Sequence, residues 1–161
     1  MTKFIKLSEV KDRVYETCQD ILKRTLNLEA EASEGKHEIN GQEYSAAMKI
    51  DGSINGVVQI KYGEAIGIEI AKTMLMTEGE IPEEELVSSV TLSMAELCNI
   101  IAGNLTILFE EMKVDINISL FEQKFDINTL DKNYRQIVFN FILNNNLIQV
   151  ILFIDGIFRK P

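Results

Sequence analysis

Apolar residues along the chain follow two spacings, one typical of helices and one typical of strands. From about Leu7 to Leu26 they recur every three or four positions, which predicts an amphipathic helix. Shorter apolar runs follow, separated by Asn-Gly and Asp-Gly sequences that favour turns. We expect strands at Asn27–Ala32, Glu43–Ile50 and Gly56–Tyr62, with turns at Asn40-Gly41 and Asp51-Gly52.

The rest of the chain repeats this order on a larger scale. A short helix at Glu64–Leu75 and a polar linker at Glu78–Ile81 lead into a long helical pattern from Pro82 to about Met112. Proline fits the first helical position, where a missing N–H costs nothing, and an unbroken helix over this range is roughly 45 Å long. Further strands are expected at Asp115–Leu120, Arg135–Leu143 and Leu147–Ile154, with a turn at Asn144-Asn145-Asn146.

The order of elements predicts an α+β fold. A helix and three strands occur twice, which suggests two related halves that form a largely antiparallel sheet packed by long helices. A short echo supports this, because Glu16-Thr17-Cys18-Gln19 in the first helix resembles Glu96-Leu97-Cys98-Asn99 in the long one. With 161 residues, the chain suits one domain spanning 1–161.

Charge and composition argue against several classes of function. The net charge of −9 argues against a nucleic-acid partner, since phosphate backbones require a cationic surface. His37 is the single histidine and lies in a polar segment, so we expect a loop residue and no histidine-built metal site. Cys18 and Cys98 favour reduced thiols in the cytoplasm. We find no signal peptide at the N-terminus, no phosphate-binding glycine loop and no apolar run long enough for a membrane span.

The long helix has one apolar and one mixed side. A helical projection gathers its core residues on one side, namely Val90, Met94, Leu97, Ile101, Leu105, Leu108 and Met112. Glu96 and Asn99 project together from the opposite side, where Leu92, Ile100 and Ile107 also fall. Apolar residues beside a carboxylate and an amide favour a docking surface, although a helix buried on more than one side would show the same pattern.

Asn99 and Gly103, on the mixed side of this helix, are poor helix formers. Asn99 stands in mid-helix although its amide competes with the backbone, so it either makes an internal hydrogen bond to a neighbouring loop or serves an external partner. Gly103 costs about 1 kcal/mol relative to alanine and hints at close approach by another group.

The segment from Ser93 to Asn104, Ser-Met-Ala-Glu-Leu-Cys-Asn-Ile-Ile-Ala-Gly-Asn, resembles the active-site helix of the CheC/CheX/FliY chemotaxis phosphatases. That family has Glu-x-x-Asn, usually followed by Ala-Gly, and the resemblance to CheX in element order covers essentially the whole chain. The residue four before the glutamate is Leu92 rather than a small or acidic residue, and the strand after the helix lacks the common proline. CheC relatives carry two such motifs, but here the first half has Glu16 and Gln19, and glutamine is the wrong residue.

The resemblance implies hydrolysis of the aspartyl phosphate on the response regulator CheY. Asn99 would orient the attacking water and Glu96 would pair with a regulator lysine, while Leu92, Ser93, Ile100, Gly103 and Ile107 would form the docking surface. The Mg²⁺ would belong to the regulator, so no cofactor of the protein's own is expected. CheX relatives also imply a cytoplasmic homodimer joined through sheet edges.

Two alternatives remain open from the sequence. A non-catalytic adaptor of the chemotaxis or flagellar switch could dock a regulator through the same helix face. The C-terminal strand Leu147–Ile154 is apolar on both faces, which suits either a sheet shared between two copies or a central strand within one.

Overall fold

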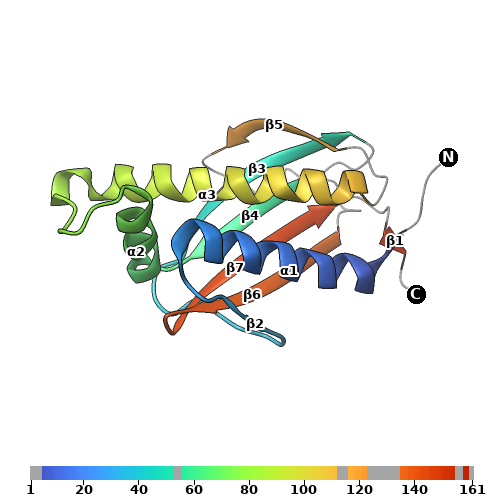
Figure 1. The fold of residues 1–161 in the computed structure, drawn as a ribbon, viewed down its shortest axis with the longest axis horizontal. Helices are drawn as coiled ribbons and strands as arrows, with labels where there is room; N and C mark the ends of the chain where they lie inside the picture. The colour runs from blue at the N-terminus through green and yellow to red at the C-terminus, as the bar shows by residue number, and fades with distance from the viewer. Residues whose placement is uncertain (1–4, 53–55, 112–115, 123–134, 155–157, 160–161) are drawn as a thin grey trace.

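The computed structural model describes residues 5–52, 56–111, 116–122, 135–154 and 158–159, which form three helices and eight strands (Figure 1). The helices are α1 (Leu7–Leu26), α2 (Glu64–Met74) and α3 (Glu83–Glu111). The strands are β1 (Ile5–Lys6), β2 (Glu31–Ser33), β3 (Tyr44–Gly52), β4 (Gly56–Tyr62), β5 (Ile116–Glu122), β6 (Arg135–Leu143), β7 (Asn146–Ile154) and β8 (Phe158–Arg159). The fold class is α+β, as the sequence predicted.

The main sheet has six antiparallel strands in the order β2-β6-β7-β4-β3-β5. The β3–β4 hairpin of the first half meets the β6–β7 hairpin of the second half at the β4–β7 pair. The first strand of each half crosses to the other half's hairpin, because β2 pairs with β6 and β5 pairs with β3. Exchanging β2, β3 and β4 for β5, β6 and β7 therefore gives the same strand order, read from the other edge of the sheet. This symmetry supports a relation between the two halves, and the crossed strands interlock them.

The long helices lie side by side on one face of this sheet and run in opposite directions (Figure 1). An exposed ion pair joins them, with Arg13 Nη2 and Glu111 Oε2 2.8 Å apart. Apolar side chains from both helices and from the inner face of the sheet form the main core. Its fully buried members include Val14, Cys18 and Leu22 of α1, Leu97, Cys98 and Ile101 of α3, and Phe139, Phe141, Val150 and Leu152 of the sheet.

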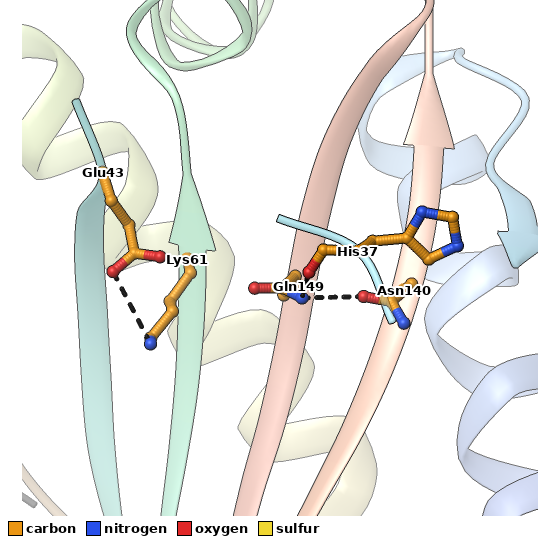
Figure 2. Close-up of polar contacts among 5 residues, drawn as sticks. All are labelled: His37, Glu43, Lys61, Asn140 and Gln149. Carbon is orange, nitrogen blue, oxygen red and sulfur yellow. Dashed lines mark hydrogen bonds and ion pairs between the residues drawn. The ribbon is translucent and has the colours of Figure 1, made fainter. Parts of the chain in front are cut away.

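The outer face of the sheet carries a buried polar cluster. Gln149 Nε2 donates to Asn140 Oδ1 at 2.8 Å and to the carbonyl of His37 at 3.1 Å. Asn140 Nδ2 donates to the carbonyl of Gly35 at 3.2 Å. Figure 2 shows His37 beside Gln149 and Asn140, and the ion pair between Glu43, just before β3, and Lys61 of β4. The loop around His37 is therefore held on this face, and the imidazole has a local partner, since Nε2 lies 2.8 Å from Ser33 Oγ.

Most element boundaries agree with the apolar periodicity, and the β6–β7 turn adds a detail. The turn residues are Asn144 and Asn145, with φ of 46° and 64°, and Asn146 already belongs to β7. Positive φ at both central residues of a two-residue hairpin is the type I′ geometry, which asparagine tolerates well. The turn is thus one residue shorter than the sequence predicted.

The largest difference concerns the segment after α1. We predicted a strand at Asn27–Ala32, but β2 is Glu31–Ser33. Asn27 has a φ of 54° and its N–H donates to the carbonyl of Lys23 at 2.9 Å, which is the left-handed cap that ends a helix. Residues 28–30 therefore connect α1 to β2, which pairs with β6.

Smaller differences from the sequence-based expectations occur at the ends of elements and at the termini. Asp51-Gly52 was predicted as a turn but forms the end of β3, and residues 53–55 lie outside the described part of the chain. Met112 and Asp115 also lie outside it. The short parallel pair β1–β8 was not predicted.

The position of β7 accounts for its apolar character. β7 lies between β4 and β6, so a central strand within one chain explains why both of its faces are apolar. α3 is long and apolar enough to cross a membrane by length and composition, and half of its most apolar window is buried in the fold. A core helix of a soluble protein passes the same test, so α3 alone does not indicate a membrane span.

Candidate functional site

The orientation of α3 is fixed by its inner side. Seven residues on that side are fully shielded from solvent, namely Met94, Leu97, Cys98, Ile101, Ala102, Leu105 and Phe109. Cys98 Sγ also donates to the carbonyl of Val58 on β4 at 3.7 Å. Because this apolar stripe is packed against the sheet and α1, the helical repeat fixes which residues lie on the opposite side of α3. The opposite side of α3 is thereby held toward solvent on a rigid element.

Glu96 and Asn99 lie on this solvent side and both are exposed. In the described part of the chain, neither side chain has a hydrogen-bond or ion-pair partner. Asn104 on the same helix differs, because its Nδ2 donates to the carbonyl of Ile100 at 2.8 Å. The internal hydrogen bond that would explain a mid-helix asparagine is thus present for Asn104 and not found for Asn99. The Asn99 amide is available to an external group.

Apolar residues flank the pair along the helix. Leu92 is 65% exposed and Ile107 is 56% exposed, and they are separated by about 22 Å of helix with Glu96 and Asn99 between them. Ile100 and Gly103 are partly exposed on the same side. Exposed aliphatic residues around a carboxylate and an amide form a surface that a protein partner can desolvate.

Ser93 is the one candidate docking residue that the structure buries. Its residual exposure is 5%, whereas the other four candidates remain partly or largely accessible. On an ideal helix Ser93 lies about 120° from Asn99, at the margin where the mixed side meets the core side. Ser93 therefore supports the helix packing and does not contribute surface for a partner.

The corresponding residues of α1 are arranged differently. Glu16 is exposed, but Gln19 Nε2 donates to the carbonyl of Ala30 at 3.0 Å. That hydrogen bond ties α1 to the segment entering β2, so the amide is occupied by the fold. Of the two equivalent helix positions, only the one on α3 presents an unpaired amide within the described residues.

The chemistry of the site follows from one carboxylate and one amide. Within the residues described, no group of three or more His, Cys, Asp or Glu side chains is placed to hold a metal ion. An amide can donate to one oxygen and accept from another, which suits the orientation of a water molecule. A carboxylate on an exposed helix face can pair with a cationic side chain of a partner.

The sequence did not reveal a second apolar feature of α3. Val87 is 79% exposed, and it lines a small pocket together with residues from β3, β4 and α2. Its lining comes from four separate elements, so no local spacing could have indicated it.

The family model described as chemotaxis phosphatase CheX matches residues 44–141, which include α3 and the site. No curated protein matches the chain.

Solved structures share the fold over nearly the whole chain. The CheX–CheY–BeF3–Mg²⁺ complex from Borrelia burgdorferi has a TM-score of 0.73 at 21% identity, covering 91% of this chain and 98% of that one. CheX from Desulfovibrio desulfuricans has a TM-score of 0.73 at 17% identity, covering 91% and 99%. The FliG–FliM complex from H. pylori is more distant, with a TM-score of 0.59 at 7% identity, covering 90% and 88%. Because the family model covers more than half of the sequence, the chain belongs to the CheX family of chemotaxis phosphatases.

Proposed function

We propose that this protein dephosphorylates a CheY-type response regulator, with Asn99 orienting the attacking water and Glu96 pairing with a lysine of the regulator. The observation that carries the proposal is the exposed Asn99 amide, which lacks a partner among the described residues and stands three positions after an exposed carboxylate. The CheX family supports the reaction class, and the B. burgdorferi complex supports a CheY partner.

The reaction places modest demands on the protein. An aspartyl phosphate is a reactive acyl phosphate, so positioning a water in line with the scissile P–O bond is a useful contribution by itself. The water oxygen bonds to phosphorus, the P–O bond to the aspartyl carboxylate breaks, and the products are inorganic phosphate and the free carboxylate. A hundredfold acceleration corresponds to only about 2.7 kcal/mol. One well-placed amide can supply that amount.

The metal in this scheme belongs to the partner. The B. burgdorferi complex contains CheY, Mg²⁺ and BeF3, a mimic of a phosphoryl group, together with CheX. We propose that the Mg²⁺ is held by the regulator, that this chain brings no cofactor of its own, and that the reaction takes place in the cytoplasm. Leu92, Ile100, Gly103 and Ile107 then provide the surface around the inserted amide.

The decisive experiment is the decay of a phosphorylated regulator in the presence of the purified protein. Asn99→Ala should reduce the acceleration at least about tenfold, because the water loses its orienting group, while affinity for the BeF3-treated regulator stays close to that of the parent. Asn104→Ala is the matched control, since the same change on the same helix removes an amide that is bonded within the fold. Decay at the parent rate with Asn99→Ala would refute the assignment.

An adaptor that docks a regulator without hydrolysing it is the second candidate. The H. pylori FliG–FliM complex shares the fold, so the fold alone does not separate the two functions. The same decay assay separates them: an adaptor binds the regulator and leaves its phosphate lifetime unchanged.

We further propose that the protein forms a homodimer through sheet edges. The outermost strands of the main sheet are β2 and β5, which each pair on one side only within the described chain. An edge strand offers unpaired N–H and C=O groups to another copy. Sedimentation equilibrium should give twice the mass of the 18.3 kDa chain, and a monomer at high micromolar concentration would contradict the proposal.

A further inference from the structure

A small apolar pocket lies between α2, the start of α3 and the ends of β3 and β4. Its lining includes Tyr44, Tyr62, Ile68, Leu86, Val87 and Val90, and its volume is about 80 Å³. By the same measure one water molecule needs about 10–15 Å³, so the pocket has room for one aliphatic side chain. The rings of Tyr44 and Tyr62 stack with centroids 5.8 Å apart and form an ordered aromatic wall. We call this feature the α2–α3 pocket.

Exposed apolar side chains occur at the same end of the molecule. Val87 in the pocket wall is 79% exposed, and Leu75 and Met76 at the end of α2 are 51% and 91% exposed. Figure 1 shows that the N-terminal part of α3 extends beyond the sheet, with α2 and its linker beside it. On an ideal helix Val87 points about 120° away from Asn99. The α2–α3 pocket is thus a separate surface from the Glu96–Asn99 face.

The surroundings of the pocket are strongly acidic. Residues 63–92 hold seven glutamates and a single lysine. Glu64 lines the pocket itself, and the exposed carboxylates of the linker and the first turn of α3 are Glu78, Glu80, Glu83, Glu84 and Glu85. Glu69 is the exception in this region, because Asn144 Nδ2 donates to its carboxylate. An apolar recess with an acidic border complements a cationic segment that carries an aliphatic residue.

We propose that the α2–α3 pocket docks a basic amphipathic segment of a partner protein, with one aliphatic side chain filling the recess and lysine or arginine residues facing the glutamates. A second copy of this chain docking through the same surface is a poor occupant, since it would bring two acidic borders together. Nucleic acid and anionic lipid surfaces are repelled for the same reason. The proposal goes beyond the phosphatase reaction, because neither Glu96 nor Asn99 takes part.

The test uses the full chain and a fluorescein-labelled peptide of lysine, alanine and leucine, with its leucines on one helical face. Fluorescence anisotropy at low salt should show saturable binding to the parent. A peptide of the same composition, scrambled so that no apolar face forms, should bind at least about fivefold more weakly if the recess takes an aliphatic anchor. Val87→Ser removes apolar area from an exposed position that the fold does not need, and should weaken binding about fivefold.

Charge variants provide the matched comparison. Glu83→Gln, Glu84→Gln and Glu85→Gln together should weaken peptide binding about tenfold and reduce its salt dependence. Glu9→Gln, Asp12→Asn and Glu16→Gln on exposed positions of α1 remove the same charge elsewhere and should change binding less than twofold. Equal losses from both triple variants, no effect of Val87→Ser, equal binding of the scrambled peptide, or no binding to the parent would each overturn the proposal.

These outcomes are independent of the phosphatase assignment. Val87→Ser should leave regulator dephosphorylation at the parent rate, and Asn99→Ala should leave peptide affinity unchanged. Failure of one proposal is therefore visible without reference to the other.

Discussion

The side-chain amides of this protein differ in whether the fold itself occupies them. Gln19, Asn104, Asn140 and Gln149 each donate to a carbonyl or amide oxygen within the fold. Asn99 is exposed and has no such partner in the described chain. The sequence identified Asn99 through its unfavourable mid-helix position, but the choice between an internal bond and an external role required the surrounding atoms.

The burial of Ser93 shows the limit of a helical projection at the same scale. Ser93 and Ile100 lie about 20° apart on an ideal helix, yet Ser93 is 5% exposed and Ile100 remains partly accessible. Whether a side chain at the edge of the buried face is covered depends on which neighbouring elements pack against the helix at that position along its axis. That information is tertiary and cannot be read from spacing.

Glu96 is expected to contribute to regulator binding. Glu96→Ala should weaken binding of the BeF3-treated regulator about five- to tenfold at low salt, mainly through slower association, because an exposed carboxylate contributes long-range attraction to a lysine. Titration calorimetry or surface plasmon resonance at two salt concentrations measures the effect. Glu16→Ala, at the equivalent exposed position of α1, is the control and should bind like the parent. Unchanged affinity for Glu96→Ala would remove its proposed role.

Long secondary-structure elements were predicted more accurately from the sequence than short ones. α1, β4 and β6 have the predicted bounds, because their apolar periodicity persists over many residues. β2 contains only three residues and β1 and β8 two each, so their positions depend on pairing with distant strands. The left-handed cap at Asn27 then displaced the predicted strand. The position of a short strand is determined by partner strands that lie far away in the sequence.

Packing between α2 and its neighbours gives a prediction at the element scale. A Cβ at Gly67 would lie 2.9 Å from the ring of Tyr62 and 3.0 Å from Val90, inside the wall of the α2–α3 pocket. Alanine gains about 1 kcal/mol of helix propensity, but overpacking a core typically costs about 1–3 kcal/mol. Because Tyr62 is buried and stacked on Tyr44, we expect Gly67→Ala to lower the free energy of unfolding by about 1 kcal/mol.

Urea denaturation checks this expectation through the midpoint at constant slope. Gly79→Ala is the control, since its Cβ would meet nothing within 4 Å. That variant should stay within about 0.5 kcal/mol of the parent. An increase in stability for Gly67→Ala would mean that the aromatic wall yields to the new methyl group.

At the scale of the whole molecule, the two halves of the chain are interlocked. The repeat of helix and three strands was visible in the sequence, but the exchange of β2 and β5 between the hairpins was not, since strand order is a long-range property. One consequence is that neither half completes its own part of the sheet. Cys18 and Cys98 occupy corresponding positions in the similar four-residue segments of α1 and α3. Both are fully shielded from solvent between these helices and the shared sheet.

These two thiols predict how global stability depends on pH. Burial raises the pKa of Cys18 and of Cys98 from 9.0 to about 12, because desolvation disfavours each thiolate. The unfolded chain ionises near pH 9 and the folded chain does not, so this stabilisation is fully present below pH 9 and is lost as the pH rises toward 12. The loss amounts to up to about 4 kcal/mol for each thiol.

Urea denaturation of the reduced protein at a series of pH values from neutral to strongly alkaline measures this loss directly. Tyrosine and lysine residues also titrate in this range, so the informative quantity is the difference between the parent and Cys18→Ala/Cys98→Ala. The double variant should be less stable at neutral pH because two buried side chains are truncated. Its stability should then decline less steeply above pH 9, since the unfolded chain no longer gains thiolates that the folded chain excludes. Parallel declines in the two proteins would show that the thiols ionise in the folded state, and therefore that the layer beneath the shared sheet admits water.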